Sequence, residues 1–344
     1  MKTVLHILPT IPPVINGVGD FGFLLAEAMA ELGYSNNIFL VKKLPDSSTV
    51  NKVEAFNAHN LYQKINDYKP QTVVLHYANY AYQAKGLPFH LVSHLKKAKA
   101  VLNCKVIIYF HELYSSSNSV FKISFYTNFL QKYILNGLYS MADHTFTNCD
   151  LYQQLLYKAV KGKQQKNTVT GIFSNIAEDW FKKSISKDDE ALVVFGSAQR
   201  RKKLYDNPKF KSIIQKLGVS KVYDIGSGQM GSSNEHVLFH ATGAIPAKEV
   251  ASYLNKARFG AIDYVPQILG KSGILSAYAA FGVIPVNFNE GIEELHDGLK
   301  ENFNYLNLNS SLPPVDVETM KNDVLNWYKP RNRFAIAKEI ARYL

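Results

Sequence analysis

One buried strand can be read directly from the sequence: Lys105-Val106-Ile107-Ile108-Tyr109-Phe110, followed at once by His111 and Glu112. The run is almost continuously apolar and rich in β-branched and aromatic residues, which is typical of a parallel strand buried on both faces. Similar short runs alternate with longer helical patterns along the chain. This alternation predicts the α/β class, with parallel sheets and crossover helices.

The alternation occurs in two sets. In the first set, strands are expected at Thr3–Leu8, Asn37–Val41, Thr72–His76, Lys105–Phe110 and His144–Thr147, and helices at Phe21–Leu32, Val53–Tyr68, Leu91–Leu102 and Phe121–Met141. In the second set, strands are expected at Ala191–Phe195, Lys221–Ile225, Val237–His240, Arg258–Ile262 and Val283–Asn287, with helices at Pro246–Lys256 and Ser272–Phe281. Because 344 residues are more than one core usually organises, we expect two doubly wound, Rossmann-like domains facing a central cleft.

The charge-rich stretch Ile176–Glu190 lies between the two sets and is the expected linker. The predicted domains are therefore residues 1–175 and 176–344, with the final helix free to pack back on the first domain. A hinge in the linker lets such domains close over a ligand and exclude water.

Composition narrows the choice of partners and compartment. Lys and Arg number 39 against 28 Asp and Glu, a net charge of +11, which favours anionic partners without choosing among them. The two cysteines, Cys104 and Cys149, exclude a disulfide framework and fit a reducing compartment. With no apolar run long enough for a signal peptide or a membrane span, the sequence predicts a cytoplasmic protein.

Two glycine-containing loops follow predicted strands. Asn16-Gly17-Val18-Gly19 opens a helix, and it is read either as an anion or substrate contact or as a tight turn. Gly226-Ser227-Gly228-Gln229-Met230-Gly231 matches the dinucleotide fingerprint, but the residues after it alternate like a strand. An NAD site is therefore not expected there, and the alternative left open is a glycine loop, including Gly228, that lines the cleft floor.

Two further strand ends carry cations. Gly270-Lys271-Ser272 imitates a P-loop, yet Val265 stands where that motif needs glycine. Ser272 is instead a predicted N-cap, and with Lys271 the helix start is read as a phosphate site, or alternatively as an ordinary capped helix. Gly196 and Ser197 precede the run 200–203, four consecutive cations, which we expect in a strand-end loop where they neutralise a diphosphate or form a solvated face.

His111 follows the buried strand, where a histidine can donate to a substrate oxygen or transfer a proton. Ser115 stands where a zinc-protease motif needs a second histidine. The pairs His90/His94 and His236/His240 have no third ligand nearby, so they are read as structural or surface histidines and no metal is expected.

In order and spacing, these positions resemble the two-domain GT-B glycosyltransferases, and among them the retaining family-4 group that uses nucleotide sugars. The likeness covers about Val4 to Asn289. It is carried by Asn16–Gly19 with the helix Leu24–Gly33, His111, Ala142–Asn148, Ser174-Asn175-Ile176, Phe195-Gly196 with Arg201-Lys202, Gly243–Pro246 with Glu249 and Leu254, and Gly273–Ala280 with Gly282 and Pro285.

The resemblance implies a transferase that moves a sugar from a nucleoside diphosphate sugar, such as a UDP or GDP sugar, to a glycan, lipid-linked or small-molecule acceptor, with no metal or other cofactor. The first domain would hold the acceptor and the second the donor. The implied catalytic residues are His111, Glu112 and Lys271. The implied donor-binding residues are Gly17, Gly19, Gly196, Ser197, Arg201, Lys202, Gly228, Ile245, Ser272 and Gly273.

The family's two glutamates have no counterpart, since the region reads Leu269-Gly270-Lys271-Ser272 and Ser276-Ala277-Tyr278. This departure keeps open a non-catalytic protein of the same fold that binds a nucleotide or glycan. A second hypothesis places the protein at the inner face of the cell membrane, with the basic Leu95–Lys99 and the aromatic segment 121–133 meeting anionic headgroups. Nucleic-acid binding is not expected, because the cations are dispersed and no recognition module is present.

Overall fold

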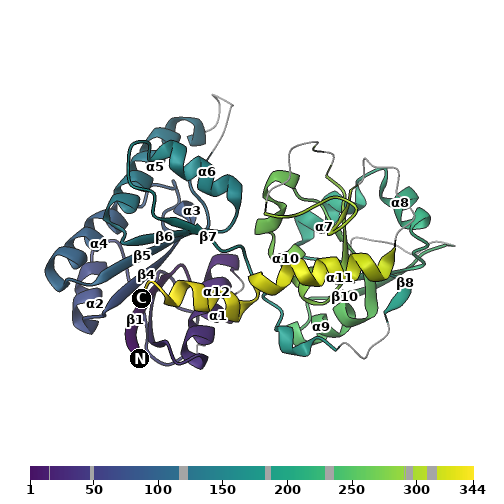
Figure 1. The fold of residues 1–344 in the computed structure, drawn as a ribbon, viewed down its shortest axis with the longest axis horizontal. Helices are drawn as coiled ribbons and strands as arrows, with labels where there is room; N and C mark the ends of the chain where they lie inside the picture. Colours follow the sequence, from purple (N-terminus) through teal and green to yellow (C-terminus); the bar gives the residue numbers. More distant parts are fainter. Residues whose placement is uncertain are drawn as a thin grey trace. The chain divides into compact units, whose positions relative to one another are not determined.

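The chain forms two compact units in the computed structural model (Figure 1). The structure describes residues 1–14, 16–46, 50–115, 123–182, 187–228, 236–289, 291, 297–307 and 316–344, with the backbone alone at 123–126 and 189. Unit 1 contains Met1–Gly171 and Arg333–Leu344, and unit 2 contains Ile172–Asn332. The sequence places the boundary at 175/176, four residues later, and its expected linker includes the short 3₁₀ helix Glu178–Trp180 and the start of the first strand of unit 2.

Unit 1 is built on a parallel sheet of seven described strands in the order β3-β2-β1-β4-β5-β6-β7. The strands are β1 Lys2–Leu8, β2 Ser35–Val41, β3 Val53–Ala55, β4 Thr72–Tyr77, β5 Lys105–Phe110, β6 His144–Thr147 and β7 Asn167–Val169. The strand order reverses direction between β1 and β4, which is the switch point of a Rossmann sheet.

Helices cover both faces of this sheet. They are α1 Gly17–Glu31, α2 Leu61–Tyr68, α3 Asn79–Tyr82, α4 Phe89–Leu102, α5 Ile123–Met141, α6 Asp150–Ala159 and α12 Arg333–Ala341. Alternate strand residues such as Leu5, Leu75 and Ile108 form the core under α2, α4, α5 and α6. The returning C-terminal helix α12 lies beside α1 (Figure 1).

Unit 2 repeats the topology with six described parallel strands in the order β10-β9-β8-β11-β12-β13. The strands are β8 Asp188–Phe195, β9 Lys221–Ile225, β10 Leu238–Gly243, β11 Ala257–Ile262, β12 Ile284–Asn287 and β13 Leu306–Asn307. The helices are α7 Ala198–Tyr205, α8 Phe210–Lys216, α9 Ala247–Lys256, α10 Gly273–Ala280 and α11 Val317–Tyr328, with 3₁₀ turns at Pro266–Lys271 and Lys329–Arg331. The switch point here lies between β8 and β11.

Two expected elements differ from the structure. The helix expected over Val53–Tyr68 is wrong: Val53–Ala55 pairs with β2, and α2 starts only at Leu61. Side-chain oxygens of Asn57 and Asn60 accept from backbone N–H groups in the turn between them, which replaces the helical hydrogen bonds. The run 200–203 lies on α7 and not in a loop, so its four side chains point in different directions. No helix in the described ranges is long and apolar enough to cross a bilayer.

Candidate functional site

The topology directs attention to the carboxyl ends of the strands at the two switch points. In doubly wound sheets, ligands bind beyond these ends, where the loops on either side diverge. In unit 1 these loops follow β1, β4 and β5. In unit 2 they follow β8, β9 and β11. Every site residue expected from the sequence falls within the described part of the chain.

Arg201 organises the loops of unit 2. Its side chain is fully buried, and Nη1 forms an ion pair with Asp224, the fourth residue of β9. Nε donates to the Gly196 carbonyl oxygen at 3.2 Å, while Nη2 donates to the carbonyl oxygens of Ser227 and, at 2.7 Å, Gly228. The guanidinium therefore ties the loop after β8 to the loop after β9.

This arrangement turns backbone N–H groups outward. In a planar trans peptide the N–H points opposite to the carbonyl, so the N–H groups of Ser197 and Gly228 face away from Arg201. The turn needs glycine, because Gly196 and Gly226 have φ of +140° and +147°. A side chain on Gly226 would also place its Cβ 2.4 Å from the Gly196 oxygen. Outward N–H groups on adjacent loops are the elements of an anion-binding nest.

The N-terminus of α10 lies next to this pair of loops. A Cβ on Gly196 would lie 3.0 Å from Cδ1 of Ile274, the second residue of α10. Ser272 is the N-cap, as expected, and its hydroxyl accepts from the Leu275 N–H at 3.3 Å. Lys271 is half-buried directly before the cap, and a Cβ on Gly273 would meet none of the described residues within 4 Å. A helix N-terminus of this kind favours a bound anion.

The other cations of α7 are paired within unit 2. Lys202 forms an exposed ion pair with Asp206 at 2.7 Å, and Lys203 pairs with Asp263 at 2.9 Å. The Arg200 guanidinium lies 5.1 Å from the centroid of the Tyr264 ring. Arg201, which the sequence predicts to meet a diphosphate, is buried against Asp224, and its other donors contact the carbonyl oxygens of the loops. Lys202 is a surface residue whose amine already has a partner.

Ile245 lies in the loop between β10 and α9, at the same edge of the sheet. The Gly226 N–H donates to the Gly243 carbonyl at 3.0 Å, which joins this loop to the loop after β9. Ile245 is partly exposed there. The structure thus brings Gly196, Ser197, Gly228, Ile245, Ser272 and Gly273 to one edge of unit 2.

In unit 1, the loop after β1 ends in a capped helix. Asn16 Oδ1 accepts from the N–H groups of Val18 and Gly19 at 3.1 and 2.9 Å. Gly19 is needed for packing, since its Cβ would lie 2.4 Å from the Thr10 carbonyl oxygen. Gly17 is exposed and a Cβ there would meet none of the described residues within 4 Å, so none of these residues requires glycine at this position.

Asp20 is an acidic group that the sequence reasoning passed over. It lies in the first turn of α1, and Oδ2 accepts from the Asn16 N–H at 3.3 Å. Burial raises the pKa of Asp20 to about 6, and the Asn16 hydrogen bond offsets only part of that rise. A carboxyl with such a pKa can hold or release a proton near neutral pH.

His111 is 5% exposed and lies at the end of a row of stacked rings. Its ring centroid is 4.5 Å from that of Tyr109 and 5.5 Å from that of His76, and the edge of Phe21 lies against it. His76 continues to His6, and both are fully buried. Burial lowers the pKa of His6 to about 4 and that of His76 well below 6.5, so both are neutral at pH 7. The sequence reasoning singled out His111 alone.

Glu112 differs from its neighbour. Its side chain is exposed and accepts from the Tyr152 hydroxyl at 3.0 Å. The Glu112 and His111 N–H groups both donate to the Tyr77 carbonyl, which fixes the backbone at the carboxyl end of β5. Of the expected pair, the structure places one side chain in the ring stack and the other at the surface.

Three buried polar atoms near these strand ends have no hydrogen-bond partner among the described residues: Thr10 Oγ1, Asn79 Nδ2 and Asn148 Oδ1. Asn148 also donates through Nδ2 to the His111 carbonyl at 3.2 Å, so it lies beside the histidine. Buried polar atoms usually have partners, so these three are candidates for contact with a polar ligand. Their residue types give no sequence signal, because only the fold places them at one edge.

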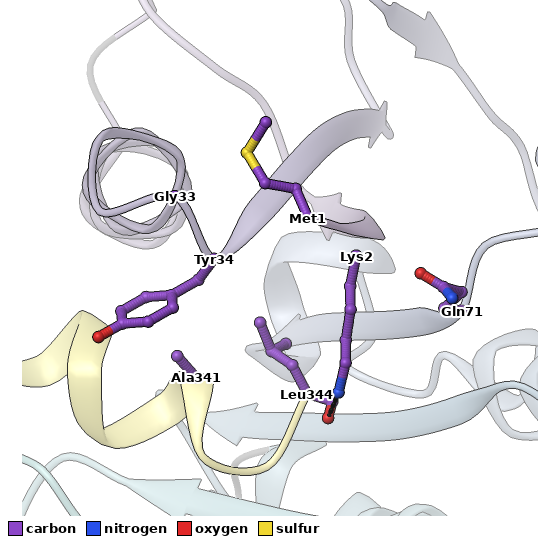
Figure 2. Close-up of a pocket in the computed structure, with 7 residues that line it drawn as sticks. All are labelled: Met1, Lys2, Gly33, Tyr34, Gln71, Ala341 and Leu344. Atoms are coloured by element: carbon purple, nitrogen blue, oxygen red, sulfur yellow. Dashed lines mark hydrogen bonds between the residues drawn. The ribbon is translucent and has the colours of Figure 1, made fainter.

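A pocket of about 310 Å³ lies elsewhere in unit 1, at the opposite edge of the sheet (Figure 2). It is lined by Met1, Lys2, Gly33, Tyr34, Gln71, Ala341 and Leu344. Lys2, Tyr34 and Gln71 precede or begin strands, so this is the amino edge. None of the expected site residues lines it. Ligands of doubly wound sheets bind beyond the carboxyl ends of the strands, so the carboxyl edge is the better candidate for the functional site.

The surface of α4 and α5 carries the residues of the membrane hypothesis. Phe129 and Tyr133 are 75% and 65% exposed on α5. Lys97 lies over the Tyr62 ring, and Lys99 pairs with Asp143 at 2.7 Å. Residues 121 and 122 lie outside the described ranges, as do the side chains of 123–126.

Among the described residues, no group of three or more His, Cys, Asp or Glu side chains is arranged so that it could hold a metal ion. His94 Nδ1 accepts from the Tyr62 N–H at 2.8 Å, so one member of the His90/His94 pair serves a structural role.

The comparisons with known proteins agree with this topology. No protein-family model matches the sequence, and no curated protein matches it. Among solved structures, the chain is similar to Anabaena HepE (Alr3699) in complex with UDP-glucose, with 11% identity, 99% of each chain covered and a TM-score of 0.65. The chain has the GT-B fold.

Two other structures extend the comparison. AviGT4, a glycosyltransferase involved in avilamycin A biosynthesis, is 10% identical, with 100% of this chain and 97% of that chain covered and a TM-score of 0.54. A Listeria monocytogenes protein assigned as a UDP-N-acetylglucosamine 2-epimerase is 13% identical, with coverage of 98% and 94% and a TM-score of 0.57. At such identities the likeness establishes the fold, and function has to be argued from the site.

Proposed function

We propose that this chain is a glycosyltransferase that moves a sugar from a nucleoside diphosphate sugar to a glycan, lipid-linked or small-molecule acceptor without a metal ion. The observation that carries the proposal is the edge of unit 2. There, Arg201 turns the N–H groups of two glycine loops outward, beside the capped N-terminus of α10. Similarity of fold to HepE, solved with UDP-glucose, and to the glycosyltransferase AviGT4 supports the same reading.

The proposed chemistry follows from where negative charge develops. When the bond between the sugar and the diphosphate breaks, charge accumulates on the departing diphosphate. Fixed N–H dipoles at Ser197 and Gly228, the α10 N-terminus at Ser272 and Gly273, and the Lys271 ammonium would stabilise that charge without reorganising. Arg201 would act by holding the loops, and Ile245 would lie beside the nucleoside base.

Unit 1 would supply the groups that meet the acceptor. His111 and Asp20 are titratable groups at its carboxyl edge, and Gly17 leaves room for close approach of a ligand. Glu112 and Gly19 would support this edge, Glu112 at the surface and Gly19 through its packing on Thr10.

Gly273 gives a sharp test of the donor site. In Gly273→Glu, the new Cβ meets none of the described residues within 4 Å and a carboxylate suits a first helical turn, so we expect the fold to be retained. The carboxylate would repel a bound diphosphate. We expect calorimetric affinity for UDP and GDP to fall by about tenfold or more, the equivalent of about 1.4 kcal/mol.

Two variants serve as controls for this experiment. Gly273→Ala adds a side chain without charge, and Ser252→Glu adds the same charge on the exposed face of α9. Both should bind like the wild type. Equal affinity in Gly273→Glu and Gly273→Ala would remove the α10 N-terminus from the donor site.

A non-catalytic nucleotide- or glycan-binding protein is the second candidate. It is favoured by the absence of the two family glutamates around α10, where Ser276 instead donates to the Ile172 carbonyl at 2.7 Å. Purified protein incubated with UDP and GDP sugars separates the two. Release of nucleoside diphosphate supports the enzyme, and binding without release supports the alternative.

The proposed location is the cytoplasm, with contact at the inner membrane face through Phe129 and Tyr133. Exposed aromatic side chains near lysines suit an anionic headgroup layer. Flotation with anionic liposomes should carry the wild type upward and leave a Phe129→Ser/Tyr133→Ser variant behind. A wild type that stays in the soluble fraction would refute this location.

A further inference from the structure

A continuous chain of hydrogen-bonding side chains crosses unit 1 beneath the candidate site. His111 Nε2 lies 3.3 Å from His76 Nδ1, and His76 Nε2 lies 3.5 Å from His6 Nδ1. At the far end, His6 Nε2 lies 3.2 Å from Asn37 Oδ1. The histidines belong to the neighbouring strands β1 and β4 and to the end of β5.

Asn37 determines which atoms donate and which accept along this row of side chains. Its Nδ2 donates to the Ala26 carbonyl oxygen at 2.6 Å, so the amide is oriented with Oδ1 toward His6. A carbonyl oxygen can only accept a hydrogen bond. The proton on His6 must therefore be on Nε2, and His6 Nδ1 carries the lone pair.

The donor and acceptor nitrogens of His6 then determine those of His76 and, through His76, those of His111. A neutral imidazole has one donor and one acceptor nitrogen, so the identity of one fixes the other. Since His6 Nδ1 accepts, His76 Nε2 must donate to it and His76 Nδ1 must accept. His111 Nε2 then donates to His76 Nδ1. Burial of His6 and His76 keeps both rings neutral, as this reasoning requires.

We infer that Asn37, His6 and His76 are positioning residues that fix His111 in its Nε2-protonated tautomer, so that His111 Nδ1 is an acceptor toward a substrate hydroxyl. The tautomer follows from the geometry of unit 1, whereas the substrate being a sugar or its acceptor rests on the proposed function. While the His111 ring is neutral, any hydrogen bond at Nδ1 is one that it accepts, so a substrate hydroxyl can donate to this nitrogen whereas a bare carbonyl or phosphate oxygen cannot.

The packing holds the rings in this geometry. A Cβ on Gly22 of α1 would lie 3.0 Å from His76 Cγ and Nδ1, so the helix backbone closes directly over that ring. Phe21 lies edge-on to His111, and Tyr109 stacks on it. The hydrogen-bonded row ends at the Asn37 side-chain amide, and an amide does not carry protons under ordinary conditions. The row is therefore suited to orienting His111 and not to conducting protons away.

The tautomers can be measured directly in the ligand-free protein. In the full chain labelled with ¹⁵N-histidine, long-range ¹H–¹⁵N correlation spectra distinguish protonated from unprotonated ring nitrogens. We expect His6, His76 and His111 all to show a protonated Nε2 and an unprotonated Nδ1. A protonated Nδ1 on His111 would overturn the inference, whatever the enzyme does.

Neighbouring positions on β2 provide a matched pair of variants. Asn37→Leu removes the acceptor, so the fixed pattern of the three histidines should give way to mixed tautomers. Asn36→Leu changes the adjacent, exposed asparagine, whose Oδ1 accepts from the Lys52 ammonium at 3.3 Å, and should leave the three rings unchanged. The His144 signals, from outside the row, report whether unit 1 stays folded.

His76→Phe supplies a second route if Asn37→Leu does not fold. It should release the His111 tautomer while His6, still held by Asn37, keeps its own. An unchanged His111 pattern in His76→Phe would contradict the inference. If the protein turns over a nucleotide sugar, His76→Phe should lower turnover by about tenfold or more with UDP affinity unchanged. The predicted tautomers without any turnover would refute the proposed function and leave this inference standing.

Discussion

Arg201 is the residue on which the edge of unit 2 depends. It is 0% exposed and its partner Asp224 is 1% exposed, so removing the guanidinium leaves a carboxylate buried without its counter-ion. Breaking a buried ion pair on one side costs about 3–5 kcal/mol. We expect Arg201→Met to lower the free energy of unfolding of unit 2 by about that amount.

Urea unfolding followed by tryptophan fluorescence measures this change, because Trp180 and Trp327 both belong to unit 2. Lys202→Met is the comparison variant. Its ion pair with Asp206 is exposed on both sides, so the cost should be within about 1 kcal/mol. Comparable losses in the two variants would contradict the role given to Arg201.

The roles of individual residues such as Arg201 could not be predicted from the sequence alone. The run of cations at 200–203 is visible in the sequence, but which member is buried depends on the helical phase of α7 and on Asp224 in another strand. The histidine row likewise depends on register: His6 pairs with Val74 and His76 with Tyr109, which puts all three histidines on one sheet face. By contrast Ser272 was predictable, because an N-cap is a local feature.

Among the helices and strands, α10 is the one whose position is constrained by the close contacts of Tyr278. The Tyr278 hydroxyl donates to the carbonyls of Val193 and Ala261 at 3.2 and 3.0 Å, and its ring covers Gly260 of β11. A Cβ at Gly260 would lie 2.6 Å from that ring. We expect Gly260→Ala to destabilise unit 2 by about 1–3 kcal/mol through overpacking.

The same variant should also weaken nucleotide binding, because a displaced α10 moves its N-terminus away from the Gly196 loop. Fluorescence-detected unfolding and UDP calorimetry give the two readouts. Gly273→Ala, whose new Cβ meets nothing within 4 Å, is the matched substitution and should change neither. Wild-type stability in Gly260→Ala would show that α10 tolerates displacement at this contact.

Elements with strong local signals were predicted closely, and short ones were not. The strands β5, β6 and β9 have the bounds expected from their apolar runs. The three-residue strands β3 and β7 were missed, because so short a segment is defined by its neighbour in the sheet rather than by its own pattern. Because β3 was missed, the helix expected over Val53–Tyr68 was predicted too long.

At the scale of the whole molecule, the double Rossmann architecture was predictable because its strands are nearly continuous apolar runs. The return of α12 to unit 1 was not fixed by any local pattern. It is supported by tertiary contact with α1, where burial and Glu31 raise the pKa of Glu27 and Arg333 lowers it. A contact between helices that are far apart in the sequence, such as α12 and α1, cannot be predicted from the residue pattern of one helix.

The two units should respond differently to acid, because the two histidines of the described residues that are fully buried and have a lowered pKa both lie in unit 1. In the unfolded chain, histidine binds a proton at its ordinary pKa of about 6.5, whereas native His6 does so only near pH 4. Between these values the unfolded state binds more protons, so the free energy of unfolding falls as pH falls. Stability that is present above pH 6.5 is lost toward pH 4, by up to about 1.4 kcal/mol per pH unit for each such histidine.

Far-UV circular dichroism follows both units, while fluorescence of Trp180 and Trp327 follows unit 2. Urea unfolding at several pH values between 4.5 and 7 should show the transition seen only by circular dichroism moving to lower urea as the pH drops. His6→Gln replaces the titrating ring with a neutral amide, so it should reduce that slope by about one proton, or about 1.4 kcal/mol per pH unit. The slope matters more than the absolute stability, because His6→Gln also changes packing at every pH. If His6→Gln kept the wild-type slope, His6 would not be neutral in the native protein, and the direction assigned to the histidine row would lose its basis.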